Sequence, residues 1–320
     1  MTHIVLIGAG ALGGRHLQSL ISLGENVRVT VVDPSSDSLD MARTRVSEVI
    51  SSVESVAEIS FVEGLDCVPD MIDLAVIATG SAPRLNVLKS LLKVAKVKYV
   101  VLEKVLFQSL SDYDEASELL SDNGVQAWVN CPRRMFDAYS TLKLRLNNAQ
   151  PILMEVIGGS WGLACNSIHF IDIFAFLTNS SILRVDTSNL EQSIFTSKRD
   201  GYIEFFGSLN VFFSSGHQLK LLCEHGNEAI QIKISDSHIS YLINETDGTI
   251  YANDLKCDFD LRVRYQSELT QVFSEQILCF GHAKITSFHE SLALHRPFIR
   301  ALLDFYNECQ NSSNTVLPIT

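Results

Sequence analysis

Apolar runs and helical patterns alternate over the first 130 residues of the chain. Strands that are covered on both faces are nearly continuous in Val, Ile and Leu, and such runs occur at His3–Ile7, Val27–Val32, Leu74–Ala78, Tyr99–Leu102 and Val125–Val129. Helical segments lie between them, with start signals at Ser81 and at the pair Ser111 and Asp114. This alternation predicts a doubly wound parallel sheet built from βαβ units over residues 1–130.

The pattern changes after about residue 150, where apolar and polar positions alternate as in half-buried strands. Strands are expected at Tyr202–Gly207, Asn210–Ser214, Leu219–Cys223, Ala229–Ile234 and His238–Ile243. Strands that follow one another directly favour a mostly antiparallel, open sheet. Helices are expected near Ser167–Leu177, Val263–Phe280 and His289–Cys309. The predicted class is therefore α/β over residues 1–130 and α+β over residues 131–320.

Composition narrows the possible partners and compartments. The 320 residues include 25 Lys and Arg against 37 Asp and Glu, a formal charge of −12, and neither domain is basic. We therefore expect neither nucleic acid nor an anionic membrane as a partner. The longest run without a polar side chain, Ile4–Gly14, is too short to span a bilayer and has no basic segment before it.

The cysteine pattern and the hydropathy add two further expectations. Seven cysteines without a C-x-x-C pair favour reduced thiols in the cytoplasm and no structural metal site. The mean hydropathy of +0.16 is high for an acidic chain. We therefore expect a partner subunit to cover one face of the open C-terminal sheet, in a homodimer or homotetramer.

A glycine-rich loop follows the first predicted strand directly and has the spacing G-x-G-x-x-G. Such a loop turns tightly, admits a pyrophosphate and lets a helix pack closely, as in a Rossmann dinucleotide-binding domain. The predicted cofactor-binding residues of the loop are Gly8, Gly10, Ala11, Leu12 and Gly13. Asp33 ends the second strand and is placed to accept ribose hydroxyls, which favours NAD over NADP. Ser35 and Ser36 beside it leave room for a phosphate, so the preference stays open.

Two later strand ends carry further polar residues, Thr79 and the pair Glu103-Lys104. Together with the other motifs they resemble the Gfo/Idh/MocA family, the glucose–fructose oxidoreductase and inositol dehydrogenase type of two-domain sugar dehydrogenase. The motifs run in the family's order through residues 4–172: the glycine loop with His16, Asp33, Ile77–Thr79, Glu103-Lys104, Asn130 with Arg133-Arg134, and His169-x-x-Asp172.

The resemblance implies a first domain that holds NAD, with Thr79, Glu103 and Lys104 beside it, and a second domain for substrate binding and oligomerisation. It also implies Lys104, His169 and Asp172 as catalytic residues. A lysine at a strand end can hydrogen-bond a substrate hydroxyl, and a neutral imidazole can accept its proton. Asp172 would orient the ring or hold another hydroxyl. Two simpler interpretations remain open. Lys104 could be a surface residue paired with Glu103, and His169 could be a core histidine whose polar atoms are satisfied inside the helix–sheet packing.

Arg133 and Arg134 follow the last strand of the first domain, and Asn166 lies one turn before His169. All three are candidates for substrate binding, because an arginine fork suits a phosphate or carboxylate. An anchoring role for either arginine is equally compatible with the sequence. The chain departs from the family at Val105, where a proline is usual, and at Cys165, where an aspartate is frequent. Arg84 and Gly80 also replace its usual histidine and proline.

The expected activity is NAD-dependent hydride transfer to or from a hydroxyl or keto carbon of a sugar, nucleotide sugar or cyclitol. An alternative that uses the same residues is an NAD-dependent glycoside hydrolase, in which transient oxidation is followed by elimination. A catalytically silent NAD-binding protein is a third hypothesis, suggested by Val105 and Cys165.

Overall fold

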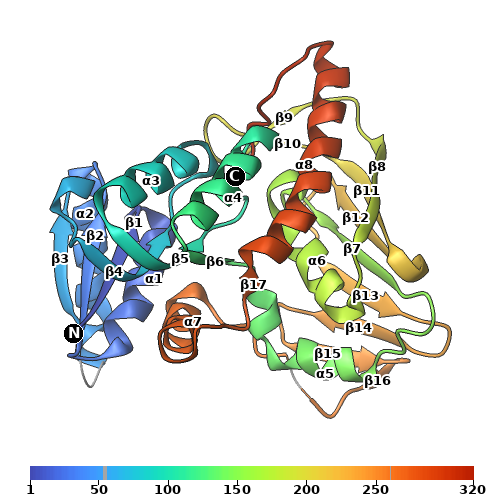
Figure 1. Ribbon diagram of the computed structural model, residues 1–320. Coiled ribbons are helices and arrows are strands. Elements are labelled where there is room, and N and C mark those ends of the chain that lie inside the picture. Colours follow the sequence, from blue (N-terminus) through green and yellow to red (C-terminus); the bar gives the residue numbers. More distant parts are fainter. Residues whose placement is uncertain (53–55, 260) are drawn as a thin grey trace. The chain divides into compact units, whose positions relative to one another are not determined.

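The computed structural model describes residues 1–52, 56–259 and 261–320, and these form two compact units (Figure 1). The first unit comprises Met1–Phe107, Ser111–Asn130 and Arg264–Phe288. The second comprises Gln108–Leu110, Cys131–Val263 and His289–Thr320.

The first unit is built on a seven-stranded sheet in the order β17-β6-β5-β4-β1-β2-β3. Six strands are parallel: β1 (Thr2–Ile7), β2 (Val27–Val32), β3 (Glu58–Val62), β4 (Met71–Ile77), β5 (Lys96–Leu102) and β6 (Gln126–Val129). β17 (Thr286–Ser287) pairs antiparallel with β6. The predicted parallel sheet is thus confirmed. The sequence pattern did not predict β3, because its residues are exposed or half-buried and form no continuous apolar run.

Helices cover this sheet on both faces, as βαβ crossovers require. They are α1 (Ala11–Leu20), α2 (Ser36–Val49), α3 (Ser81–Val94), α4 (Leu110–Asp122) and α7 (Gln266–Phe280). The first turn of α2 is capped by Ser35, whose hydroxyl accepts the Ser38 amide at 3.2 Å. These crossovers bring the glycine loop and the ends of β4 and β5 to the carboxyl edge of one sheet.

One segment of the expected second domain lies in the first unit. Arg264–Phe288 was expected to continue the range 131–320, but it groups with the parallel sheet. The reason is that α7 packs on α1 and buries Leu269, Phe273 and Ile277, while β17 extends the sheet beyond β6. The helix predicted at Val263–Phe280 is therefore present, as α7 over Gln266–Phe280, but it belongs to the first unit.

The second unit contains an eight-stranded sheet in the order β16-β15-β14-β13-β7-β12-β11-β8. Among the described residues of this sheet, only β7 and β12 pair in parallel, which confirms a mostly antiparallel sheet. The strands are β7 (Leu153–Gly159), β8 (Ile182–Leu190), β11 (Gly207–Phe213), β12 (Gln218–Glu224), β13 (Gln231–Ser235), β14 (Ser240–Asn244), β15 (Thr249–Ala252) and β16 (Leu255–Lys256). A separate ribbon joins β9 (Phe195–Thr196) to β10 (Ile203–Glu204).

The helices of this unit are α5 (Asp137–Arg145), α6 (Leu163–Thr178) and α8 (Phe288–Gln310). α6 packs on β12 and is buried at most positions. One strand prediction here was wrong: Tyr202–Gly207 is not continuous, because β10 ends at Glu204 and Gly207 starts β11 with a φ of +98°. Across the described residues, no helix is both long and apolar enough to cross a membrane.

Candidate functional site

A cavity of about 490 Å³ opens at the carboxyl edge of the parallel sheet, between the ends of β1, β2 and β4. Four of the predicted cofactor residues line it, namely Gly8, Gly10, Asp33 and Thr79. Among the wall residues that the sequence did not single out are Glu63, Leu65, Pro83 and Val87. Glu63 follows β3, so predicting that strand would have placed a second carboxylate at this edge.

The glycines of the loop have the shape that a dinucleotide requires. A Cβ on Gly10 would have no atom within 4 Å, so the space beside this residue is open. A Cβ on Gly13 would lie 1.8 Å from the Gly8 carbonyl oxygen, so only glycine lets α1 pack this close to the loop. The first amides of α1 lack helical acceptors and carry the positive end of the helix dipole, which suits a pyrophosphate.

Asp33 and Arg45 hold the loop from the neighbouring strand and helix. The Asp33 carboxylate accepts the amide of Ala9 at 2.7 Å and that of Ser35 at 2.9 Å. The Arg45 guanidinium on α2 donates to the carbonyls of Gly10 and Ala11 at 3.2 and 2.9 Å. Since a carboxylate oxygen accepts more than one hydrogen bond, Asp33 keeps capacity for a ribose hydroxyl.

Thr79 and the segment after Lys104 are tied together by one buried cation. Arg84 on α3 is only 1% exposed and donates to the backbone carbonyls of Thr79, Val105 and Leu106. The Lys104–Val105 peptide bond is cis. The Thr79 hydroxyl is buried at the cavity wall and has no hydrogen-bond partner among the described residues, which leaves it available to a ligand. The residues of this edge therefore fit a dinucleotide.

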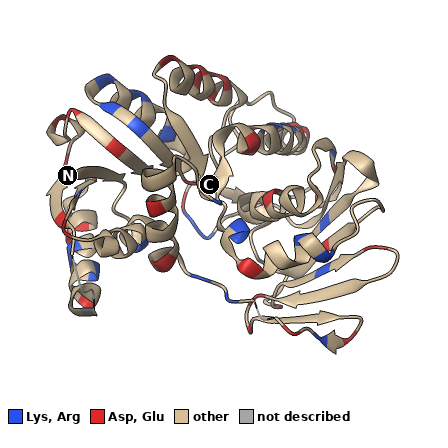
Figure 2. Ribbon diagram, turned by 60° about the horizontal axis from the view of Figure 1, so that its bottom comes forward, with Lys and Arg blue, Asp and Glu red and all other residues tan. Residues whose placement is uncertain are grey.

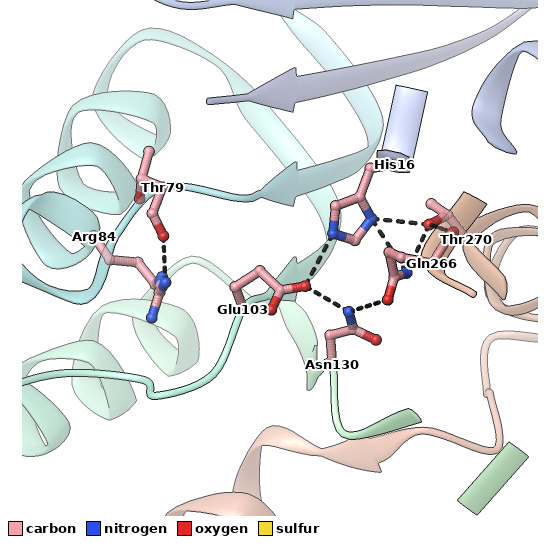
Figure 3. Close-up of polar contacts among 7 residues, drawn as sticks. All are labelled: His16, Thr79, Arg84, Glu103, Asn130, Gln266 and Thr270. Atoms are coloured by element: carbon pink, nitrogen blue, oxygen red, sulfur yellow. Dashed lines mark hydrogen bonds and ion pairs between the residues drawn. The ribbon is translucent and has the colours of Figure 1, made fainter. Parts of the chain in front are cut away.

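A closed network of polar side chains, buried except for the half-buried Gln266, lies behind the edge (Figure 3). Glu103 Oε1 accepts from His16 Nε2 at 2.9 Å and from Asn130 Nδ2 at 2.5 Å. Asn130 also donates to Gln266 at 2.7 Å, and Gln266 donates to the Thr270 hydroxyl at 2.8 Å. The hydroxyl in turn lies 2.9 Å from Nδ1 of the same imidazole. The network thus joins α1, the ends of β5 and β6, and α7.

Glu103 belongs to this network, and it is not among the residues that line the cavity. Burial raises the pKa of Glu103, but the hydrogen bonds from His16 and Asn130 and the charges of His16 and Arg84 outweigh it. The pKa of this carboxyl therefore lies below its usual value. Ala11, Leu12 and Gly13 form the first turn of α1 behind the loop, and Lys104 follows Glu103 at the end of β5. A cofactor contact by these residues stays a prediction.

In the second unit, α6 leaves one row of its surface half-exposed. Asn166, His169 and Phe176 are the positions of this helix that are not buried. Residues three, four and seven apart share a helix face, so these three positions lie on one side of α6. Asp172, on the same side, is 1% exposed. Its carboxylate accepts two hydrogen bonds from the Arg134 guanidinium, one to each oxygen, both at 2.9 Å.

Both arginines after β6 already have carboxylate partners inside the second unit. Arg133 donates to both oxygens of Glu245 at 2.8 and 2.7 Å, and Tyr139 donates to the same carboxylate at 2.7 Å. Arg134 holds Asp172 and lies 3.4 Å from Glu290. This geometry supports the anchoring role that the sequence left open, and substrate binding by Arg133 or Arg134 stays a prediction.

Charge is otherwise dispersed over the chain. Lys and Arg are interspersed with Asp and Glu over the helices and strands of both units (Figure 2). With a net charge of −12, attraction of an anionic dinucleotide has to be local. The backbone amides of the glycine loop and the start of α1 supply such a local positive region.

Comparison with known proteins agrees with this geometry. Residues 2–131 match the oxidoreductase family with an NAD-binding Rossmann fold, GFO_IDH_MocA. No curated protein sequence matches the chain. The resemblance to the Gfo/Idh/MocA family is thus confirmed over residues 2–131, which are similar to the NAD-binding Rossmann domain of that oxidoreductase family. The prediction of NAD as the cofactor is confirmed with it.

Three solved structures resemble the whole chain. UDP-N-acetylglucosamine 3-dehydrogenase GnnA from Acidithiobacillus ferrooxidans has 14% identity and a TM-score of 0.69, over 94% of this chain and 95% of that one. Scyllo-inositol dehydrogenase from Lactobacillus casei, with NAD(H) and scyllo-inositol bound, has 16% identity and a TM-score of 0.67, over 98% of both chains. A super-repressor mutant of Gal80p from Saccharomyces cerevisiae has 14% identity and a TM-score of 0.71, over 98% of both chains. At such identities the similarities establish the fold.

Proposed function

We propose that the protein is a dehydrogenase or reductase that transfers hydride between NAD and a CH–OH carbon of a sugar, nucleotide sugar or cyclitol. The observation that carries the proposal is the position of Lys104. It follows Glu103, two residues beyond the end of β5, at the sheet edge where Thr79 and the glycine loop line the cavity. The inositol and nucleotide-sugar dehydrogenases with the same fold support this substrate class.

The first unit offers a distinct residue for each part of the cofactor. The loop amides would hold the pyrophosphate, Asp33 the adenosine ribose, and Thr79 the end near the nicotinamide. Glu63 adds a second carboxylate to the cavity wall. Two carboxylates at this end repel a 2′-phosphate, and this supports NAD over NADP. When bound, NAD supplies the hydride acceptor for alcohol oxidation and, in its reduced form, the donor for ketone reduction.

His169 and Lys104 manage the proton in this proposal. During oxidation the substrate hydroxyl loses its proton to the His169 imidazole while its carbon loses a hydride. Lys104 hydrogen-bonds the same oxygen and stabilises the negative charge that develops on it. The half-exposed position of His169, on a helix that is otherwise mostly buried, supports this role over that of a core histidine.

Other residues of the second unit would position the substrate. Asn166 shares the half-exposed row of α6 with His169 and offers an amide to substrate hydroxyls. Arg134 and Asp172 hold each other, so Asp172 shapes the wall of the site through that pair. In this proposal, substrate contacts by Arg133 and Arg134 use only the donors that face away from Glu245 and Asp172.

We also infer a homodimer or homotetramer formed through the C-terminal sheet. The support is a set of exposed apolar side chains on one sheet face, Leu153 and Ile157 of β7 and Leu242 of β14. Glu155 and Lys233 lie between them in the strand register, so this face is mixed apolar and charged. Exposed apolar groups of this kind are typically covered in an oligomer. A cytoplasmic location rests on the composition of the chain and its cysteine pattern.

The proposal is tested by incubating the protein with NAD and a panel of sugars, inositols and nucleotide sugars, with NADH absorbance and sugar release as readouts. Net NADH formation with one class is expected. Sugar release without net NADH would instead indicate the glycoside hydrolase. NAD binding with no turnover, unaffected by Lys104→Ala or His169→Ala, would indicate a silent NAD-binding protein and would overturn the proposal.

A further inference from the structure

A buried carboxylate that the proposed mechanism does not use lies at the N-terminus of the helix that carries His169. Glu204, at the end of β10, is 9% exposed. One of its oxygens accepts the Ala164 amide at 2.7 Å, and the other accepts the Cys165 amide at 3.3 Å. The Cys165 thiol donates to the same carboxylate. In the described part of the chain, no Lys, Arg or His forms an ion pair with Glu204.

This arrangement is costly unless the carboxylate has a task. A buried carboxylate is usually paired with a cation, since desolvation disfavours its charged form. Here only two amides, one thiol and the positive end of α6 balance the charge. A neutral side chain would cap the same amides at lower cost, so capping alone does not explain a glutamate at this position.

Helix geometry connects Glu204 to His169. Cys165 and His169 are four residues apart on α6 and are therefore neighbours on one face. A helical side chain leans toward the N-terminal end of its helix, so the imidazole is directed over the turn that contains Cys165. The Glu204 carboxylate lies on that turn.

We propose that Glu204 is a positioning residue for His169: it fixes the first turn of α6 through Cys165, and its negative charge stabilises the imidazolium that forms when His169 takes the substrate proton. The inference rests on the proposed role of His169 and adds an electrostatic partner to it. No further reactant is needed, because the proton stays on the imidazole and the carboxylate stays ionised.

The other ionisable groups packed against α6 are distinct from this one. Arg133 and Arg134, on the turn Pro132–Met135, pair with Glu245 and Asp172. Lys143 of α5 lies over the Phe176 ring at 3.9 Å, in the last turns of α6. Cys223 of β12 faces Glu204, and burial raises the pKa of that thiol. Burial also raises the pKa of Glu204, against the hydrogen bonds from Cys165 and Ala164.

The test is an NMR titration of the His169 imidazole in the full chain, assigned by loss of its signal in His169→Gln. Because a negative charge favours the imidazolium, Glu204→Gln is expected to lower the pKa of His169 by about half a unit or more. Glu228→Gln removes an exposed glutamate of the same unit as a matched control and is expected to leave that pKa within about 0.2 units. An equal response to both variants would overturn the proposal.

A second variant separates the charge from the cap. The double variant Cys165→Asp with Glu204→Gln returns a carboxylate to the first turn of α6. An acceptor for the amides at the start of this helix is thereby kept, so the protein should stay folded even if folding needs that cap. This variant is expected to raise the pKa of His169 back toward the wild-type value, and no recovery would contradict the proposal. The titration requires no turnover, so an absence of sugar oxidation would count against the proposed function alone.

Discussion

Nε2 of His16 lies 2.9 Å from Oε1 of Glu103, and both side chains are buried. His16 is on the helix that starts at the glycine loop, and Glu103 directly precedes Lys104. The pair therefore joins the helix after the glycine loop to the strand end that precedes Lys104, the proposed catalytic lysine.

Removing His16 should destabilise the protein strongly. His16→Ala leaves the Glu103 carboxylate buried without its imidazole partner, which costs about 3–5 kcal/mol. The control is His225→Ala, since His225 and Glu191 form an exposed pair worth at most about 1 kcal/mol. Urea unfolding of both variants measures the difference. Equal losses would mean that the buried pair contributes no more than an exposed one.

The stability that Glu103 contributes should depend on pH. The pKa of Glu103 is lower in the folded chain than its ordinary value of 4.5 in the unfolded chain. The stability that its ionised form provides is therefore complete above pH 4.5, and it is lost as the pH falls through the pKa of the folded state. The stability difference between wild type and Glu103→Gln should therefore shrink as the pH falls below about 4.5. A difference that stays constant from about pH 7 to about pH 3 would contradict the assignment.

Two glycines of the loop should fail in different ways. Gly10→Ala places a methyl group in open space, so the fold should be retained while the dissociation constant for NAD rises about tenfold or more, roughly 1.4 kcal/mol. Gly13→Ala forces a methyl group against the Gly8 carbonyl and should cost about 1–3 kcal/mol of stability. Calorimetric binding and thermal unfolding separate the two effects. Unchanged NAD binding in Gly10→Ala would refute the proposed pyrophosphate position.

Asp33 should set the preference for NAD. Asp33→Ala removes a charged acceptor worth about 1.5–3 kcal/mol to ribose hydroxyls and also removes its repulsion of a 2′-phosphate. The NADP-to-NAD ratio of dissociation constants should fall about tenfold or more. Asp37→Ala, an exposed aspartate in the first turn of α2, is the matched control. A ratio that responds equally to both changes would point to net charge instead of a specific contact.

The first unit was largely predictable because its signals are local. Its five central strands are covered on both faces, and the glycine loop, Asp33 and Thr79 sit at fixed offsets from strand ends. β3 was not predicted because it is half-exposed, and its terminal carboxylate, Glu63, was missed with it.

The contacts between distant residues were not predictable from one sequence. Gln266 and Thr270 enter the His16 network from α7, some 250 positions away, and no local pattern indicates such a partner. The carboxylates that hold Arg133 and Arg134 have the same origin, since Glu245 and Asp172 approach them only in the folded unit. Glu204 was not singled out from the sequence because it lies within Tyr202–Gly207, which was predicted as one strand. In the structure this segment is divided between β10 and β11.

The central claim is that hydride passes directly between a sugar or cyclitol carbon and the nicotinamide. The most direct measurement is a single turnover of the best substrate carrying deuterium at the reacting carbon, with the NADH analysed by mass spectrometry. The account predicts one deuterium in the NADH from the wild-type protein and, with His169→Ala, a rate lower by about 10²-fold or more. NADH without deuterium, or a full rate in His169→Ala, would contradict it.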